Sequence, residues 1–326
     1  PTTDCWNDRK CADEADQKAL EAGVNLTPYK YRFYFFPIGT PENGYHFAPC
    51  NANAWASFPY PDFPYVRSWF APNGADAFTL THELGHNFGL GHANVIICDQ
   101  GPIGSFVNNL ADCQRYEYGD YLDVMGSWGN RNLHHFTASH KTSIGWFDRD
   151  QVQQATQSGT YTISRLESNQ PGTKVLTISI PNSNEFNREV YFVDYRQQEG
   201  FDQTLPQPAT LGALIYLGNP IRPMNNTYLL DMHRGWPPEY NSASSDAALL
   251  DGEQFVDSEN GVTITQLAHD ASSVTLRIDL NQSISCVRNP PVVAISPPDQ
   301  TGALNQTKTY QVTVTNADTP ACPATN

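Results

Sequence analysis

Residues 76–92 read DAFTLTHELGHNFGLGH, and this stretch decides how the first part of the chain is interpreted. The run 76–88 has the length and pattern of a helix, and Gly89 can take the positive φ that ends one. On a helix, His82 and His86 stand four residues apart, so their imidazoles lie one turn apart on the same face and converge. Two imidazoles at that spacing are typical of a Zn²⁺ site, since zinc prefers nitrogen or sulfur ligands.

Glu83 and His92 complete the pattern around these two histidines. Glu83 follows the first histidine directly, so it can reach a water molecule on the metal without taking a coordination position. A turn at Gly89 lets the chain fold back and bring His92 as a third ligand. Three protein ligands leave one position open to water, which is characteristic of catalytic zinc sites. The sequence therefore predicts His82, His86 and His92 as zinc ligands and Glu83 as the catalytic general base.

The spacing H-E-x-x-H-x-x-G-x-x-H resembles the signature of the metzincin zinc peptidases, which also have a methionine turn beneath the metal. Residues 118–126, YGDYLDVMG, supply Met125 as the residue of this Met-turn. Together with HELGHNFGLGHA at 82–93 and HFTASHKTSIGW at 135–146, these segments are similar to the gametolysin family within the metzincins. The likeness covers residues 1–150 closely and the later part of the chain only loosely.

This resemblance implies a secreted zinc-dependent metalloendopeptidase that hydrolyses peptide bonds of extracellular proteins. A zinc-bound water, its pKa lowered towards ~7, would attack the polarised carbonyl while Glu83 takes the proton and passes it to the leaving amine. The strand at 66–71, or its neighbour, would be the edge on which an extended peptide adds. A different class stays open, namely a zinc-stabilised extracellular binding or adhesion protein without catalytic activity. The intact Glu83 and the open coordination position argue against that class.

In astacin-like and serralysin-like metzincins, a tyrosine two residues beyond the turn methionine can ligate the resting metal. Here Ser127 stands at that position and Trp128 follows. A serine is too short to reach the metal, and an indole N–H offers no lone pair. We therefore expect three histidines and water on the zinc, with Tyr118 and Tyr121 as the first residues to suspect if a tyrosine ligand were found.

The expected secondary structure changes near residue 150. The elements expected before it are helices at 9–22, 76–88 and 136–147, strands at 30–37 and 66–71, and a long loop from about 93 to 130. After it, short β-branched runs between Gly, Pro and Asn turns indicate an antiparallel β-sandwich. The predicted fold class is an α+β metzincin-like catalytic domain at 1–150, an all-β sandwich domain at 151–285 and a truncated immunoglobulin-like segment at 286–326.

The composition excludes some classes of partner. The net charge is −15, only 16% of the residues are charged, and no basic stripe occurs, so nucleic acids and anionic membranes are poor partners. No apolar run approaches the ~18–20 residues of a membrane span. Protein or peptide substrates remain the expected partners. A monomer is favoured, although the oligomeric state stays open.

Seven cysteines and few lysines suggest an exported protein, and the start at Pro1 is interpreted as a mature form whose targeting segment has been removed. Cys98 and Cys113 bracket a polar loop and are expected to form a disulfide. The other pairings stay open: Cys5 with Cys11, Cys50 with either of these, and Cys286 with Cys322.

Several other polar residues near the motif are expected to support the site rather than bind metal. They are His134, His135, His140, Asp120 and Asp123. None of the three histidines repeats the four-residue ligand spacing, and the two aspartates flank the Met-turn. The acidic segment 251–261, DGEQFVDSENG, raises the possibility of calcium but departs from the D-x-[DN]-x-[DN]-G loop, so a plain turn is preferred.

Overall fold

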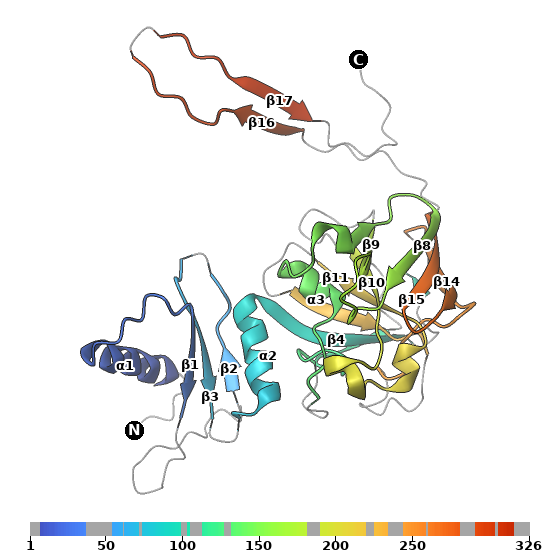
Figure 1. Cartoon of the computed structure of the whole chain (residues 1–326), viewed down its shortest axis with the longest axis horizontal. Helices are drawn as coiled ribbons and strands as arrows, with labels where there is room; N and C mark the ends of the chain where they lie inside the picture. The colour runs from blue at the N-terminus through green and yellow to red at the C-terminus, as the bar shows by residue number, and fades with distance from the viewer. Residues whose placement is uncertain are drawn as a thin grey trace, which may run out of the picture. The chain divides into compact units, whose positions relative to one another are not determined.

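The computed structural model describes most of the chain. The described residues are 7–36, 54–60, 62–71, 74–98, 103–104, 113–126, 132–180, 190–219, 225–233, 244–258, 260–280, 291–303 and 306–315. The chain divides into two compact units, Pro1–Leu280 and Asn281–Asn326. Sheets dominate and helices are few, so the fold is a sheet-rich α+β arrangement (Figure 1). None of the helices in these ranges has the length and apolar character needed to cross a membrane.

A three-stranded sheet with one helix on each face forms the N-terminal part of the first unit (Figure 1). Its elements are β1 (Tyr31–Phe35), β2 (Ala54–Ala56), β3 (Val66–Phe70), α1 (Asn7–Glu21) and α2 (Ala77–Phe88). The central strand β3 pairs in parallel with β1 and antiparallel with β2. Arg32 and Arg67 share the face covered by α1, where both form ion pairs with Asp16. Tyr31 lies on the opposite face and contacts Phe88 of α2.

A seven-stranded mixed sheet follows, in the order β6-β4-β12-β11-β10-β9-β7. Its strands are β4 (Leu90–Cys98), β6 (Cys113–Tyr116), β7 (Val152–Gln154), β9 (Val175–Ser179), β10 (Val190–Tyr195), β11 (Ala213–Gly218) and β12 (Asn225–Leu230). The short helix α3 (Ala138–Ser143) packs against β10 and β12. Because β4 pairs with β12, this sheet crosses the domain boundary predicted at residue 150.

The five-stranded sheet β5-β13-β14-β15-β8 shares a core with the seven-stranded sheet. Its strands are β5 (Ile103–Gly104), β8 (Gly159–Ser164), β13 (Gln254–Asp257), β14 (Val262–His269) and β15 (Ser273–Leu280). Phe255 and Ile264 of this sheet and Ile178 and Ile215 of the other are fully buried in the same cluster. Two packed sheets are compatible with the predicted β-sandwich. The pairing is not purely antiparallel, however, because β4–β12, β7–β9 and β5–β13 are parallel pairs joined by long connections.

The remaining elements of the described ranges are short 3₁₀ helices in the first unit and a hairpin in the second. The 3₁₀ helices are Arg149–Gln151, Gly200–Thr204 and Gln207–Thr210. In the second unit, β16 (Val292–Ser296) pairs antiparallel with β17 (Gln311–Thr315), and every residue of both strands is exposed. This hairpin lies within residues 286–326, where the sequence predicts an immunoglobulin-like segment.

Two predictions of local structure are wrong. Residues 93–130 are not one long loop, since they include most of β4 and all of β6. The helix predicted over 136–147 is shorter, because α3 ends at Ser143 and Gly145 follows with a φ of 71°.

The disulfide between Cys98 and Cys113 is confirmed, and the two residues stand directly opposite each other in the β4–β6 ladder. It therefore ties two strands together rather than closing a featureless loop. The other predicted pairings involve Cys5, Cys50, Cys286 and Cys322, which lie outside the described residues.

Candidate metal centre

The helix α2 carries the first part of the site, and its two ends are set by local chemistry. Asp76 caps the N-terminus, where its side chain accepts a hydrogen bond of 3.0 Å from the Thr79 amide. The helix ends at Phe88, and Gly89 follows in the left-handed conformation with a φ of 100°. A side chain is disfavoured in that conformation, so glycine is suited to the turn that leads directly into β4.

Three histidines converge at the junction of α2 and β4. One ligand atom from each of His82, His86 and His92 lies within 4.8 Å of the others. His82 and His86 are buried, with 4% and 8% of their surface exposed, whereas His92 is partly accessible. Among the described residues this is the group of histidine, cysteine and carboxylate side chains whose geometry could hold a metal ion.

The hydrogen bonds of the three imidazoles show which nitrogen each one offers. Nδ1 of His82 lies 2.9 Å from the Val124 carbonyl oxygen, and Nδ1 of His86 lies 2.8 Å from the Leu90 carbonyl oxygen. The third imidazole differs, because His92 Nδ1 lies 2.7 Å from a carboxylate oxygen. An acceptor at Nδ1 fixes the proton there and leaves Nε2 with its lone pair for a metal.

Burial favours the neutral form of these histidines. Desolvation lowers the pKa of His82 to about 4 and that of His86 to about 3, and it also lowers the pKa of His92. Metal binding requires deprotonated imidazole, so the triad is ready to coordinate at neutral pH. Three neutral nitrogen donors fit the preference of Zn²⁺.

Glu83 lies beside the triad on α2 and is 3% exposed. Its Oε2 atom is buried and has no hydrogen-bond partner within the described part of the chain. Burial raises the pKa of this carboxyl group to about 8. Without a cation nearby, burial favours the protonated form of this carboxyl group, whereas a metal ion beside it would favour the carboxylate that a general base requires. This orphaned atom is what a site for metal and water would contain.

The third histidine is held by strands that pair over a long sequence distance. The His92 amide donates a hydrogen bond of 2.8 Å to Asn226 Oδ1 in β12. On the other side, β6 pairs with β4 and leads into a turn where Glu117 accepts the hydrogen bond from His92 Nδ1. Neither Asn226 nor Glu117 could be identified from the sequence. No local pattern marks them, because their roles depend on strand pairing.

Met125 packs against α2, the helix that carries His82 and His86. Its side chain is fully buried, and a Cβ atom at Gly85 would overlap the Met125 sulfur. The Met125 carbonyl accepts a hydrogen bond of 3.0 Å from the Ala93 amide, which ties this turn to β4. The preceding carbonyl, that of Val124, is the acceptor for His82 Nδ1. The turn around Met125 therefore touches the ligand-bearing elements directly.

Asp123 and His140 stabilise this turn by hydrogen bonds. Asp123 Oδ1 accepts a hydrogen bond of 2.7 Å from the Met125 amide, and Oδ2 lies 2.8 Å from His140 Nδ1. His134 Nδ1 lies 2.8 Å from the Tyr121 carbonyl oxygen, and His135 Nδ1 lies 3.3 Å from Lys141 Nζ. Asp120 accepts from the Leu122 amide. None of these residues belongs to the metal-binding group found in the described ranges.

Arg196 is a supporting residue that the sequence analysis missed. It is completely buried and donates hydrogen bonds to both carboxylate oxygens of Asp202, at 2.6 and 3.0 Å. It also donates to the carbonyls of Leu122 and His135, which flank the Met125 turn. Arg196, the residue after β10, thus links the turn to the seven-stranded sheet by its hydrogen bond to the Leu122 carbonyl, while Asp202 balances its charge.

Tyr118 approaches the triad from the turn after β6. Its ring centroid lies 3.9 Å from that of His92 and 6.0 Å from that of His82. Its φ of 60° makes it the non-glycine residue with positive φ in the described ranges. The Tyr121 amide donates a hydrogen bond of 3.2 Å to Ser244 Oγ. Ser127 and Trp128, on which the expected open position depends, lie outside the described residues.

The acidic segment 251–261 contains a strand rather than a plain turn, because β13 occupies Gln254–Asp257. Its carboxylates have separate partners: Asp251 contacts His269, Glu253 contacts His233, and Asp257 accepts a hydrogen bond from a tyrosine. These carboxylates do not form a metal-binding group within the described ranges.

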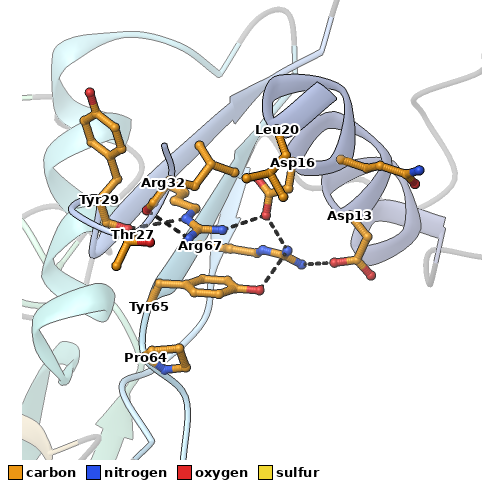
Figure 2. Close-up of a pocket in the computed structure, with 11 residues that line it drawn as sticks. Asp13, Asp16, Leu20, Thr27, Tyr29, Arg32, Pro64, Tyr65 and Arg67 are labelled. Atoms are coloured by element: carbon orange, nitrogen blue, oxygen red, sulfur yellow. Dashed lines mark hydrogen bonds and ion pairs between the residues drawn. The ribbon is translucent and has the colours of Figure 1, made fainter. Parts of the chain in front are cut away.

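A pocket of about 500 Å³ beside α1 is a second cluster of ionisable side chains (Figure 2). Arg32 and Arg67 both contact Asp16 at 2.8 Å, and Arg67 also contacts Asp13 at 2.7 Å. The Arg32 guanidinium lies over the Tyr65 ring, 3.6 Å from its centroid. Opposite charges pair within this cluster, so it holds α1 on the sheet.

Comparisons with protein-family models, curated proteins and solved structures find no match for this chain. The chemistry of the site is therefore inferred from its own residues.

Proposed function

We propose that this chain is an exported zinc-dependent endopeptidase of the metzincin type, related to the gametolysin family. The observation that carries the proposal is the convergence of three imidazoles whose Nδ1 atoms already have acceptors, beside the buried Glu83. His82, His86 and His92 would hold the zinc ion. The signature spacing and the methionine turn beneath α2 support the same assignment.

Zinc bound there would act as a Lewis acid that polarises a carbonyl and makes water a better nucleophile. Glu83 is proposed to accept the proton of the attacking water and deliver it to the leaving amine. Its burial keeps bulk water away from the carboxyl group, and its orphaned Oε2 is free of protein partners within the described ranges. Protein or peptide substrates fit this chemistry.

The edge strand β2 is proposed to receive an extended substrate. The described part of the sheet places β3 between β1 and β2, so a neighbour of β3 must offer the free edge. Of the two neighbours, β2 leads into Phe58, whose ring lies 5.1 Å from that of His86. A peptide that adds to β2 would therefore run past the metal ligands.

Export is supported by the Cys98–Cys113 disulfide, since such bonds persist in oxidising compartments. The exposed β16–β17 hairpin supports the proposal that residues 286–326 belong to an immunoglobulin-like module. A hairpin alone is only marginally stable in water, and further strands would cover its apolar side chains.

The decisive experiment is digestion of casein by the purified chain loaded with zinc, with and without a chelator. We expect cleavage that stops in chelator and returns when zinc is added. Zinc-loaded protein that binds one equivalent of metal but cleaves neither casein nor a peptide library would contradict the proposed activity and favour the adhesion class. Cleavage that persists without metal would contradict the proposed mechanism.

A further inference from the structure

The three histidines of the triad differ in the group that accepts their Nδ1 hydrogen. Two acceptors are backbone carbonyls, those of Val124 and Leu90, which carry no net charge. The third is the Glu117 carboxylate, whose Oε1 lies 2.7 Å from His92 Nδ1. Hydrogen bonds to a charged group are shorter and stronger than those between neutral groups. His92 is therefore the ligand whose donor strength depends on a side chain.

The position of Glu117 follows from the pairing of β4 and β6. The ladder places Val95 opposite Tyr116 and Cys98 opposite Cys113, where the disulfide fixes the register. The chain leaves this ladder one residue before Glu117, which brings its carboxylate to His92 near the start of β4. Any slip of β6 along β4 would move Glu117 away from the imidazole.

The turn after Glu117 is tightly determined. Tyr118 adopts a φ of 60°, and its amide donates a hydrogen bond of 3.0 Å to Asn94 Oδ1. A Cβ atom at Gly119 would lie 2.5 Å from Val95 Cγ1, so glycine is required for the turn to approach β4. A non-glycine residue held at positive φ costs free energy, which surrounding contacts must offset. Here the unfavourable backbone places Tyr118 against one side of the His92 ring while Glu117 binds its Nδ1.

We propose that Glu117 is a positioning residue that strengthens metal binding through His92. Its carboxylate orients the imidazole, holds the proton on Nδ1 and makes Nε2 a better electron donor. It also adds a negative charge near three neutral ligands. This inference rests on the proposed function only in requiring that the triad binds zinc. The Glu117 side chain is 69% exposed, so the effect of its charge should weaken as salt increases.

The test is the affinity of the full chain for zinc, measured by competition with a chromophoric chelator. The variants are Glu117→Ala, which removes the acceptor and the charge, and Glu117→Gln, which retains an acceptor of nearly the same size. Glu14→Gln, an exposed glutamate on α1, is the control for the change in charge. We expect Glu117→Ala to bind zinc about 10- to 100-fold more weakly than wild type, as is typical for such partners. The zinc affinity of Glu117→Gln should lie between those of wild type and Glu117→Ala, and its difference from the wild-type affinity should shrink in high salt.

The thermal transition of the metal-free proteins separates this role from a structural one. We expect the metal-free variants to unfold at the same temperature as metal-free wild type, because Glu117 is exposed and acts on the metal ligand. Unchanged zinc affinity in both Glu117 variants would overturn the inference, as would a weakening equalled by the Glu14→Gln control. A drop in metal-free stability that accounts for the lost affinity would also overturn it. Failure of the proposed endopeptidase activity would be seen separately, as wild type that binds zinc without cleaving protein.

Discussion

The candidate metal centre and the pocket beside α1 are both clusters of ionisable side chains, but the hydrogen-bond partners of their members lie in different places, outside the cluster in the first and within it in the second. At the metal centre, each imidazole binds an acceptor outside the triad, and the ligand atoms lie within 4.8 Å of one another. In the pocket, Arg32 and Arg67 bind Asp16 within the cluster itself (Figure 2). The three imidazole nitrogens that converge could hold a cation, whereas the opposite charges in the pocket already pair with one another.

From this difference we expect the histidine triad to bind a metal ion and the α1 pocket to stabilise the fold. Removing a residue from the histidine triad should change the metal content and the catalytic activity. Removing a residue from the α1 pocket should change the free energy of unfolding. The same kinds of side chain thus serve two purposes, and the partners of each group decide which purpose it serves.

The largest expected effect is the loss of metal and activity in His86→Ala. This imidazole is buried and held by the Leu90 carbonyl, so no neighbour can replace it as a ligand. We expect elemental analysis to find little zinc after dialysis and casein digestion to be abolished. The control is His269→Ala, which changes a histidine outside the triad and should retain both properties. Normal zinc content in His86→Ala would contradict the ligand assignment.

Glu83→Gln should reduce turnover by about 10²- to 10⁴-fold, the usual contribution of a general base. Zinc content should remain that of wild type, because Glu83 is assigned to proton transfer and not to coordination. Peptide hydrolysis and elemental analysis on the same sample check both statements. If the variant lost its metal instead, the role of Glu83 would have to be revised.

In the α1 pocket, Asp16→Ala should lower the free energy of unfolding by about 3 kcal/mol, since it leaves two partly buried arginines without this carboxylate. Tyr34 also loses its acceptor, which lies 2.8 Å from its hydroxyl group. Urea denaturation measures the change, and Glu14→Ala on the same helix is the control. Zinc affinity should not change. A variant as stable as wild type would show that the pocket does not hold α1 on the sheet.

The smallest expected effect is the pH dependence of that stabilisation. Burial alone would raise the pKa of Asp16, but hydrogen bonds from Tyr34, Arg67 and Arg32 outweigh it and lower the pKa below 3.8. A pKa that is lower in the folded state gives stability that is present above the unfolded-state pKa and lost as the pH falls through the folded-state pKa. The free energies of unfolding of wild type and Asp16→Ala should therefore differ most near neutral pH and become equal in acid. A difference that grows on acidification would contradict this sign.

The helix α2 and its residues could be predicted because their signals are local. A capping aspartate, the four-residue histidine spacing and Gly89 all lie within 76–92, and α2 was found within one residue of its predicted start. Most of the short β-branched segments after residue 150 also form strands, because β-branched residues favour strands and turn residues bound each segment. The pattern did not predict β4, because its first residues, Leu90, Gly91 and His92, belong to the histidine motif and lack the alternation of a strand.

The sequence by itself determined which residues the candidate site contains, because His82, Glu83 and His86 take their spacing from one helix and Gly89 ends that helix before His92. Only the tertiary structure decided how each imidazole is oriented. The acceptors for His82 and His92 come from the Met125 turn and from Glu117, and Asn226 holds His92 from 134 residues away. Pairing of distant strands depends on which faces can be buried together, and no property of a short segment specifies it.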